Sequence, residues 1–148
     1  MSLQEQLSDA LKTAMKAKDT LRLSVVRGIR TAIKNKEIEL GKSLSDEEII
    51  SILSTLAKQR RESATAFREG DREELAAKEE AELAILQEYL PQQLSEEELR
   101  GLVKAAIAET GASGMRDMGQ VMKALMPKTT GRADGKLVSQ LVRELLGA

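Results

Sequence analysis

The sequence predicts an all-α protein, and three observations support this prediction. Apolar residues recur every three or four positions along the 148 residues, while period-two runs of β-branched residues are missing. Helix starts are marked by a capping oxygen three residues before a carboxylate, in the pairs Ser2 and Glu5, Ser45 and Glu48, Asp71 and Glu74, and Ser95 and Glu98. Matching stop signals follow at Gly41, Gly70, Pro91 and Gly111.

Together these signals predict seven helices in two lobes. The expected ranges are 3–17, 20–39, 46–69, 72–89, 96–109, 115–126 and 134–146. Pro91 disfavours helical geometry at Leu90, and a new capping signal opens at Ser95, so we expect a domain boundary between them. The prediction is an N-terminal four-helix lobe of hairpins over residues 1–90 and a small three-helix lobe over residues 91–148.

Each lobe has candidate core residues on the apolar faces of its helices. In the first lobe these are Ile49, Ile52, Leu53, Leu56 and Ala57 on the third helix, and Leu75, Leu83, Leu86 and Leu90 on the fourth. In the second lobe they are Leu99, Leu102, Val103, Ala106, Ile107, Met118, Val121, Met122, Leu125, Leu137, Val138, Leu141, Val142 and Leu145.

The composition excludes several kinds of chemistry. Because the chain has no Cys, His or Trp, it lacks thiolate and imidazole nucleophiles, Cys/His zinc sites and disulfides. Phe67 and Tyr89 are its two aromatic residues, too few for a platform that stacks single-stranded bases. The stretch 131–137 is similar to a phosphate loop, but three residues separate its glycines and Leu137 follows the lysine. We therefore predict no catalytic residue, metal or cofactor.

Acidic clusters along the chain have a structural explanation. Asp46-Glu47-Glu48, Glu73-Glu74 and Glu96-Glu97-Glu98 fall in first helical turns, where the helix dipole favours negative charge. Glu79 and Glu82 lie three residues apart, and we expect them on a solvated helical face.

Charge is segregated although the net charge is −1. Residues 1–42 hold nine basic and five acidic side chains, residues 43–90 hold six and twelve, and residues 91–148 hold eight and seven. No apolar run is long enough for a membrane span, and the N-terminus lacks a basic-then-apolar leader. These features predict a cytoplasmic protein with basic ends and no membrane partner.

A first candidate binding surface lies on the second predicted helix. At 100° per residue, Arg27, Arg30 and Lys34 fall within about 60° of one another. We place this cationic row opposite an apolar stripe, which comprises Val25, Ile29, Ala32 and Ile33. The row is predicted to be exposed and able to contact the phosphates of a nucleic acid; solvated surface is the alternative.

A second candidate surface lies in the last third of the chain. Arg116, Gly119, Gln120 and Lys123 share a helical face, and the loop that follows adds Lys128, Gly131 and Arg132, with Lys136 in the first turn of the last helix. Backbone N–H groups at that helix start could hold a phosphate. Asp134 argues partly against this, because as N-cap it would occupy one donor with its own negative charge.

Two further features of the sixth predicted helix have alternative explanations. Gly119 costs about 1 kcal/mol relative to Ala inside a helix, and it serves either close helix packing or close approach of a partner. Met115, Met118, Met122 and Met126 line one side of the helix. We expect them to fill the core, with an adaptable partner surface as the alternative.

Five stretches of the chain resemble the YqeY-like family, also called the GatB/YqeY family. They are Leu21-Arg22-Leu23 through Ile33-Lys34-Asn35-Lys36-Glu37-Ile38-Glu39; Lys58-Gln59-Arg60-Arg61-Glu62-Ser63; Glu82-Leu83 with Tyr89-Leu90-Pro91; Asp117-Met118-Gly119-Gln120-Val121-Met122 through Met126-Pro127-Lys128; and Gly131-Arg132-Ala133-Asp134-Gly135-Lys136-Leu137-Val138. The resemblance covers essentially the full length of the chain.

The final third is also similar to the tail domain of the B subunit of the tRNA-dependent amidotransferase. This resemblance implies a helical module that contacts tRNA, and it marks Gly119, Lys123, Gly131 and Arg132 as tail-type positions. The catalytic cradle of that subunit has no counterpart in this sequence.

Three functions follow as hypotheses. The first is a tRNA-binding or tRNA-enzyme-assisting module without catalysis of its own. The second is a protein-docking module for a synthetase or amidotransferase subunit, which would use the methionine-bearing helix or the acidic segment 43–90. The third is carbon–nitrogen ligase activity with glutamine as amide donor, which we do not expect from this chain alone.

Overall fold

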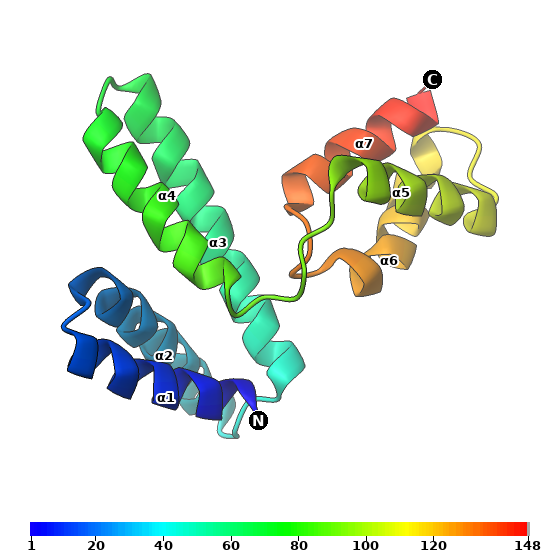
Figure 1. The fold of residues 1–148 in the computed structure, drawn as a ribbon. Helices are drawn as coiled ribbons and strands as arrows, with labels where there is room; N and C mark the ends of the chain where they lie inside the picture. The colour runs from blue at the N-terminus through cyan, green and yellow to red at the C-terminus, as the bar shows by residue number, and fades with distance from the viewer. Residues whose placement is uncertain (148) are drawn as a thin grey trace. The chain divides into compact units, whose positions relative to one another are not determined.

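The protein is all-α, as predicted, in a computed structural model that describes residues 1–147. Its helices are α1 (Leu3–Ala17), α2 (Thr20–Leu40), α3 (Asp46–Glu69), α4 (Glu73–Gln87), α5 (Glu96–Thr110), α6 (Met118–Thr129) and α7 (Gly135–Gly147), with a 3-10 turn over Met115–Asp117 (Figure 1). No strand occurs within the described range. The chain divides at the Leu90-Pro91 step into two compact units, which we describe separately.

Three of the four predicted capping signals form as expected, and the fourth was wrong. The side chains of Ser2, Ser45 and Ser95 each accept a hydrogen bond from the N–H three residues on, and the paired glutamate accepts one from the serine N–H. Asp71 instead has a left-handed backbone with φ of +57°. Arg72 therefore precedes α4 without a side-chain cap.

Glycine ends α2, α3 and α5 at the predicted positions Gly41, Gly70 and Gly111, whereas the end of α6 differs from the prediction. Gly41 and Gly111 are left-handed, with φ of +68° and +67°. α6 continues through Pro127 to Thr129 instead of ending at residue 126. The proline removes one helical hydrogen bond, while the hydroxyls of Thr129 and Thr130 donate to the carbonyls of Leu125 and Met126 at 3.1 and 2.7 Å.

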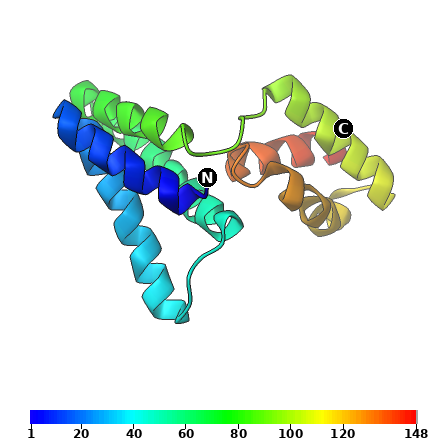
Figure 2. The same cartoon turned by 60° about the horizontal axis from the view of Figure 1, so that its bottom comes forward.

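The core of the first unit is formed by all four of its helices. Its buried apolar residues are Leu3, Leu7, Val26, Ile29, Ile33, Leu44, Ile49, Leu53 and Leu86. On α4 the prediction was partly wrong: Ala76, Ile85 and Leu86 are buried, whereas Leu75 and Leu83 are half-buried. α1 and α2 form one hairpin, and α3 and α4 form the other, as Figure 2 shows from a second direction.

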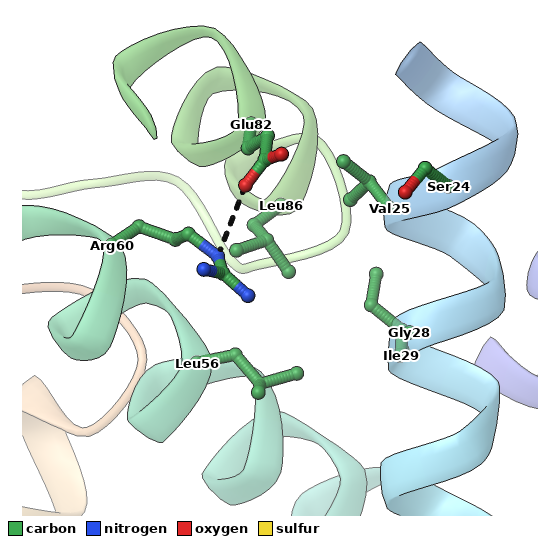
Figure 3. Close-up of a pocket in the computed structure, with 8 residues that line it drawn as sticks. All are labelled: Ser24, Val25, Gly28, Ile29, Leu56, Arg60, Glu82 and Leu86. Atoms are coloured by element: carbon green, nitrogen blue, oxygen red, sulfur yellow. Dashed lines mark ion pairs between the residues drawn. The ribbon is translucent and has the colours of Figure 1, made fainter. Parts of the chain in front are cut away.

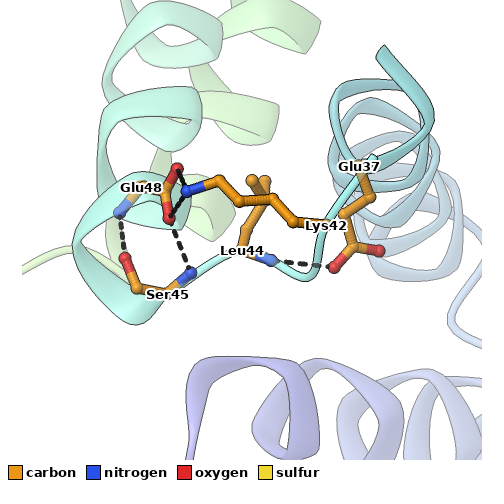
Figure 4. A network of polar contacts seen from close by, with 5 residues as sticks. All are labelled: Glu37, Lys42, Leu44, Ser45 and Glu48. Atoms are coloured by element: carbon orange, nitrogen blue, oxygen red, sulfur yellow. Dashed lines mark hydrogen bonds and ion pairs between the residues drawn. The ribbon is translucent and has the colours of Figure 1, made fainter. Parts of the chain in front are cut away.

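The connection between α2 and α3 is held by a polar network (Figure 4). Glu37 accepts hydrogen bonds from the Leu44 N–H at 3.0 Å and from the Gln4 side-chain amide at 2.9 Å. Lys42 forms an ion pair with Glu48 at 3.0 Å. The carboxylate of Glu37 thereby joins α1, α2 and the loop before α3.

The second unit encloses its own core, largely as the sequence predicts. Its buried apolar residues are Leu99, Val103, Ala106, Val121, Leu125, Val138, Leu141, Val142 and Leu146. Leu102, Ile107, Met118, Met122, Leu137 and Leu145 pack against them while half-buried. Within residues 1–147, no helix combines the length and apolar character that a bilayer crossing requires.

Candidate functional site

The cationic row of α2 lies exposed along a groove between α1 and α2. Arg27, Arg30 and Lys34 all line this groove, which has a volume of about 540 Å³. Its other walls come from both helices of the hairpin and comprise Gln4, Leu7, Leu11, Thr31, Ile33 and Glu37. Three cations therefore share one groove with a single carboxylate, that of Glu37.

The buried stripe of α2 is rotated about the helix axis relative to the predicted stripe. Val26 is fully buried together with Ile29 and Ile33, whereas Val25 is half-buried. The cationic row is thus beside the buried stripe, not opposite to it as predicted, because Val26 turns that stripe toward Arg30. Because of this rotation, the cationic row lies next to α1.

The row differs from five other arginines of the protein in having no carboxylate partner. Ion pairs are formed by Arg22, Arg60, Arg68, Arg72 and Arg100. Hydrogen bonds that Arg68 donates to Glu73 and Glu80 raise the pKa of Arg68 above its ordinary value. Among the described residues, Arg27, Arg30 and Lys34 form no ion pair, and Glu37 is already bonded to Leu44 and Gln4.

The loop between α6 and α7 uses its candidate residues for internal contacts. Arg132 donates from Nε to the carbonyl of Gln92 at 3.2 Å and from Nη1 to the carbonyl of Lys128 at 3.5 Å. Gly131 is buried with φ of +77°, and its carbonyl accepts from the Gln93 amide at 2.7 Å. These two residues anchor the segment that enters α5.

The start of α7 also has an internal partner. The carboxylate of Asp134 accepts from the N–H of Lys136 at 3.3 Å, as anticipated for an N-cap. Lys128 lies 3.9 Å from Glu109, while the side chain of Lys136 is exposed. The loop therefore offers a ligand two lysine side chains, Lys128 and Lys136, and Lys128 already has an ion-pair partner. The sequence suggested a larger cluster of free cationic groups.

The exposed face of α6 forms a separate group. Arg116, Gly119 and Lys123 are all exposed, and a Cβ added to Gly119 would meet no atom within 4 Å. Packing within the protein therefore does not require a glycine there. The expectation that the methionines fill the core holds for Met118 and Met122, which are half-buried. It was wrong for Met115 and Met126, whose exposed fractions are 48% and 58%.

Comparison with known proteins establishes the family. Residues 4–146 match the family described as Yqey-like protein. The chain belongs to the YqeY-like family. A relative in Pyrenophora tritici-repentis, named "Altered inheritance of mitochondria protein 41, mitochondrial", is 34% identical over 146 residues, which are 97% of this chain and 80% of the relative.

Two further relatives carry the same name and match a shorter part of this YqeY-like protein. The protein of Lachancea thermotolerans is 41% identical and that of Saccharomyces cerevisiae 40% identical, each over 87 residues. These matches cover 58% of the chain and 46% and 47% of the relatives. The chain thus spans about half the length of these two proteins, which are named as mitochondrial.

The sequence did not indicate a small cavity that the YqeY-like protein has between α2, α3 and α4 (Figure 3). It measures about 110 Å³ and is lined by Ser24, Val25, Gly28, Ile29, Leu56, Arg60, Glu82 and Leu86. Arg60 contacts Glu82 at 3.4 Å and Glu79 at 3.2 Å, and the two glutamates are 14% and 16% exposed. The prediction of a solvated glutamate face was therefore wrong, since the pair ties α3 to α4.

The residues of α1 that border the row were also missed. Gln4, Leu7 and Leu11 are more than fifteen positions from the row in sequence. Only the hairpin packing of α1 on α2 brings them beside it, and no local motif marks them. Over residues 1–147, no three acidic side chains gather as a metal site would need.

Proposed function

We propose that this YqeY-like protein binds folded RNA, and tRNA above all, through phosphate contacts of the cationic row on α2. One observation carries the proposal: Arg27, Arg30 and Lys34 lie exposed in one groove without an ion-pair partner within the described chain. The chain has 23 basic and 24 acidic side chains, so there are enough carboxylates for every cation to form an ion pair. In an unpaired row no neighbouring carboxylate compensates the positive charge, so the cations are available to an anionic partner.

The geometry of the row supports contacts to a phosphate backbone. Arg27 and Lys34 are seven positions apart, which corresponds to about 10 Å along a helix axis. Guanidinium groups bind phosphate oxygens in a bidentate manner. Thr31 and Gln4 line the same groove and supply neutral donors for further backbone or 2′-hydroxyl contacts.

The remaining composition supports a folded RNA over single strands. Phe67 and Tyr89 are both half-buried, and Tyr89 packs against the core of the first unit. Single-stranded bases are commonly held by stacking on exposed aromatic rings. A chain without such rings is suited to the backbone and shape of a duplex region.

The choice of tRNA rests on the resemblance of the last third to the amidotransferase tail. Lys128 and Lys136 enter the proposal as a second contact region, whereas Arg132 is engaged with its own backbone. We propose no catalysis, cofactor or membrane contact. A cytoplasmic location remains our prediction. The alternative compartment is the mitochondrion, because the relatives are named as mitochondrial proteins.

The test is a binding titration of the full chain with total tRNA at several salt concentrations. The variant Arg27→Ala/Arg30→Ala/Lys34→Ala should lose at least tenfold in affinity. The negative slope of log K against log salt concentration should decrease in magnitude by roughly 2 to 3. Lys58→Ala/Lys78→Ala/Lys104→Ala is the matched control, since it removes three exposed lysines elsewhere. Equal losses in both variants, or no binding of the unmodified protein at low salt, would contradict the proposal.

Ligase activity is tested separately. Purified protein is incubated with Glu-tRNA, ATP and glutamine or ammonia, and the aminoacyl group is analysed. We expect no conversion to Gln-tRNA by this chain alone. Conversion that depends on the chain would replace the binding proposal with an enzymatic one.

A further inference from the structure

The exposed face of α6 differs chemically from a phosphate-binding row. Met126 is 58% exposed and lies two helical turns after Gly119. Met115 is 48% exposed and precedes Gly119 by four residues. Both apolar side chains are thus exposed within seven residues of Gly119, and the exposed cations Arg116 and Lys123 lie in the same segment.

The glycine at the centre of this face is not required by the fold. Gly119 is in the first turn of α6, and it is not among the residues with positive φ. An added Cβ would meet no atom within 4 Å. Glycine costs about 1 kcal/mol relative to alanine in a helix interior and less in a first turn. No contact within residues 1–147 uses the missing side chain, and the open space above Gly119 permits the close approach of another backbone.

The charges on this face indicate what that partner carries. Arg116 and Lys123 form no ion pair within the part of the chain that the structure describes. A partner that buries the two methionines must contribute apolar side chains, and its carboxylates would neutralise the two cations. Methionine adapts its shape to such a contact, and phosphate groups would leave its apolar surface uncovered.

From these observations we infer that the Met115–Met126 face, with Gly119 at its centre and Arg116 and Lys123 beside it, docks an acidic amphipathic helix of a protein partner. Glycine in one helix allows a second helix to cross closely, because the axis separation depends on the side chains at the contact. The partner helix would present apolar residues at three- and four-residue spacing with glutamates or aspartates alongside. This interaction goes beyond the RNA binding proposed for α2 and uses a different surface.

The experiment first identifies the occupant by crosslinking. The full chain with Met126→p-benzoylphenylalanine is expressed in its native cells, irradiated, and the adducts are sequenced. We expect a crosslink to an acidic amphipathic segment of another protein. A crosslink to RNA or to a second copy of this chain, or no adduct at all, would overturn the inference.

A synthetic peptide copying the crosslinked segment then tests the chemistry. Its affinity for the purified chain should fall at least tenfold with Lys123→Glu, and exchange of the facing glutamate of the peptide for lysine should restore it. A peptide that binds both forms equally contradicts the charge assignment. Arg27→Ala/Arg30→Ala/Lys34→Ala should bind the peptide normally, so failure of this inference is distinguishable from failure of RNA binding.

Gly119→Ala provides a readout that loss of folding cannot imitate. It should weaken peptide binding without lowering the melting temperature, because the added Cβ meets no atom within 4 Å. Gly101→Ala is the matched control, because Gly101 is an exposed glycine in α5 whose added Cβ also meets no atom within 4 Å. It should raise the melting temperature without changing peptide affinity. Unchanged peptide binding by Gly119→Ala would exclude close backbone approach.

Discussion

The cationic row on α2 and the loop between α6 and α7 contain the same kinds of residue but use them differently. Arg27 and Arg30 extend from a regular helix into a groove and find no carboxylate. Arg132 folds back onto the carbonyls of Gln92 and Lys128. The comparison teaches that the number of cations in a segment does not determine how many are available to a ligand, because nearby carbonyls compete for them.

The largest difference in stability is expected between Arg132→Ala and Arg27→Ala. Loss of the charged hydrogen bonds of Arg132 should lower the free energy of unfolding by about 1–2 kcal/mol. Arg27→Ala should change it by less than about 0.5 kcal/mol, because the side chain is exposed and unpaired. Urea denaturation followed by circular dichroism measures both. Equal effects would show that the row is also structural.

Replacing Gly131 or Gly28 by alanine should change the stability of the protein in opposite directions. Gly131→Ala places a side chain at φ of +77° and should destabilise the protein by roughly 1 kcal/mol. Gly28→Ala should stabilise it by roughly 0.5–1 kcal/mol, because Gly28 lies within α2 and an added Cβ meets no atom within 4 Å. Thermal unfolding of the two variants gives the comparison. Stabilisation by Gly131→Ala would contradict the left-handed turn.

Acid should weaken the capping boxes of both units in the same pH range. A hydrogen bond from the Ser45 backbone, followed by the contact with Lys42, lowers the pKa of Glu48. Bonds from the Ser95 side chain and backbone lower the pKa of Glu98. A folded-state pKa below the unfolded value of about 4.3 stabilises the protein above that pH, and this contribution is lost as pH falls through the folded pKa.

The variant Glu48→Gln/Glu98→Gln should therefore show a smaller loss of stability between neutral pH and about pH 3. Denaturation midpoints measured across this range test the prediction. An unaltered pH profile would mean that other carboxylates account for the acid sensitivity.

The smallest effect is expected at the surface pair of Lys128 and Glu109. Its 3.9 Å separation and exposed side chains predict that Glu109→Gln changes the free energy of unfolding by less than about 0.5 kcal/mol. The released Lys128 should raise tRNA affinity slightly if the loop is a second contact region. A fall in affinity would exclude Lys128 from the interface.

Local signals predicted the helices well, and long-range contacts explain what was missed. The capping boxes at Ser2, Ser45 and Ser95 depend on residues three positions apart, so the sequence displays them directly. At Asp71 the turn after α3 places the left-handed backbone one residue beyond Gly70, whose φ is −90°. Aspartate tolerates that conformation, and local pattern does not distinguish it from an N-cap.

The candidate site was predictable in part for the same reason. Helical spacing is enough to gather Arg27, Arg30 and Lys34 on one side of α2. The choice of Val26 over Val25 for the core depends on packing against the other helices of the unit. The engagement of Arg132 depends on the carbonyl of Gln92, forty residues earlier in the chain.

The short segment before α5 has a practical consequence for dividing the protein. The Leu94 N–H donates to the Arg132 carbonyl at 2.8 Å, and Gln93 and Gln92 bond to Gly131 and Arg132. Leu94 also packs against the second core. A recombinant fragment intended to fold as the second unit should therefore begin at Pro91, because one that begins at Ser95 discards three hydrogen bonds and an apolar contact that belong to the fragment.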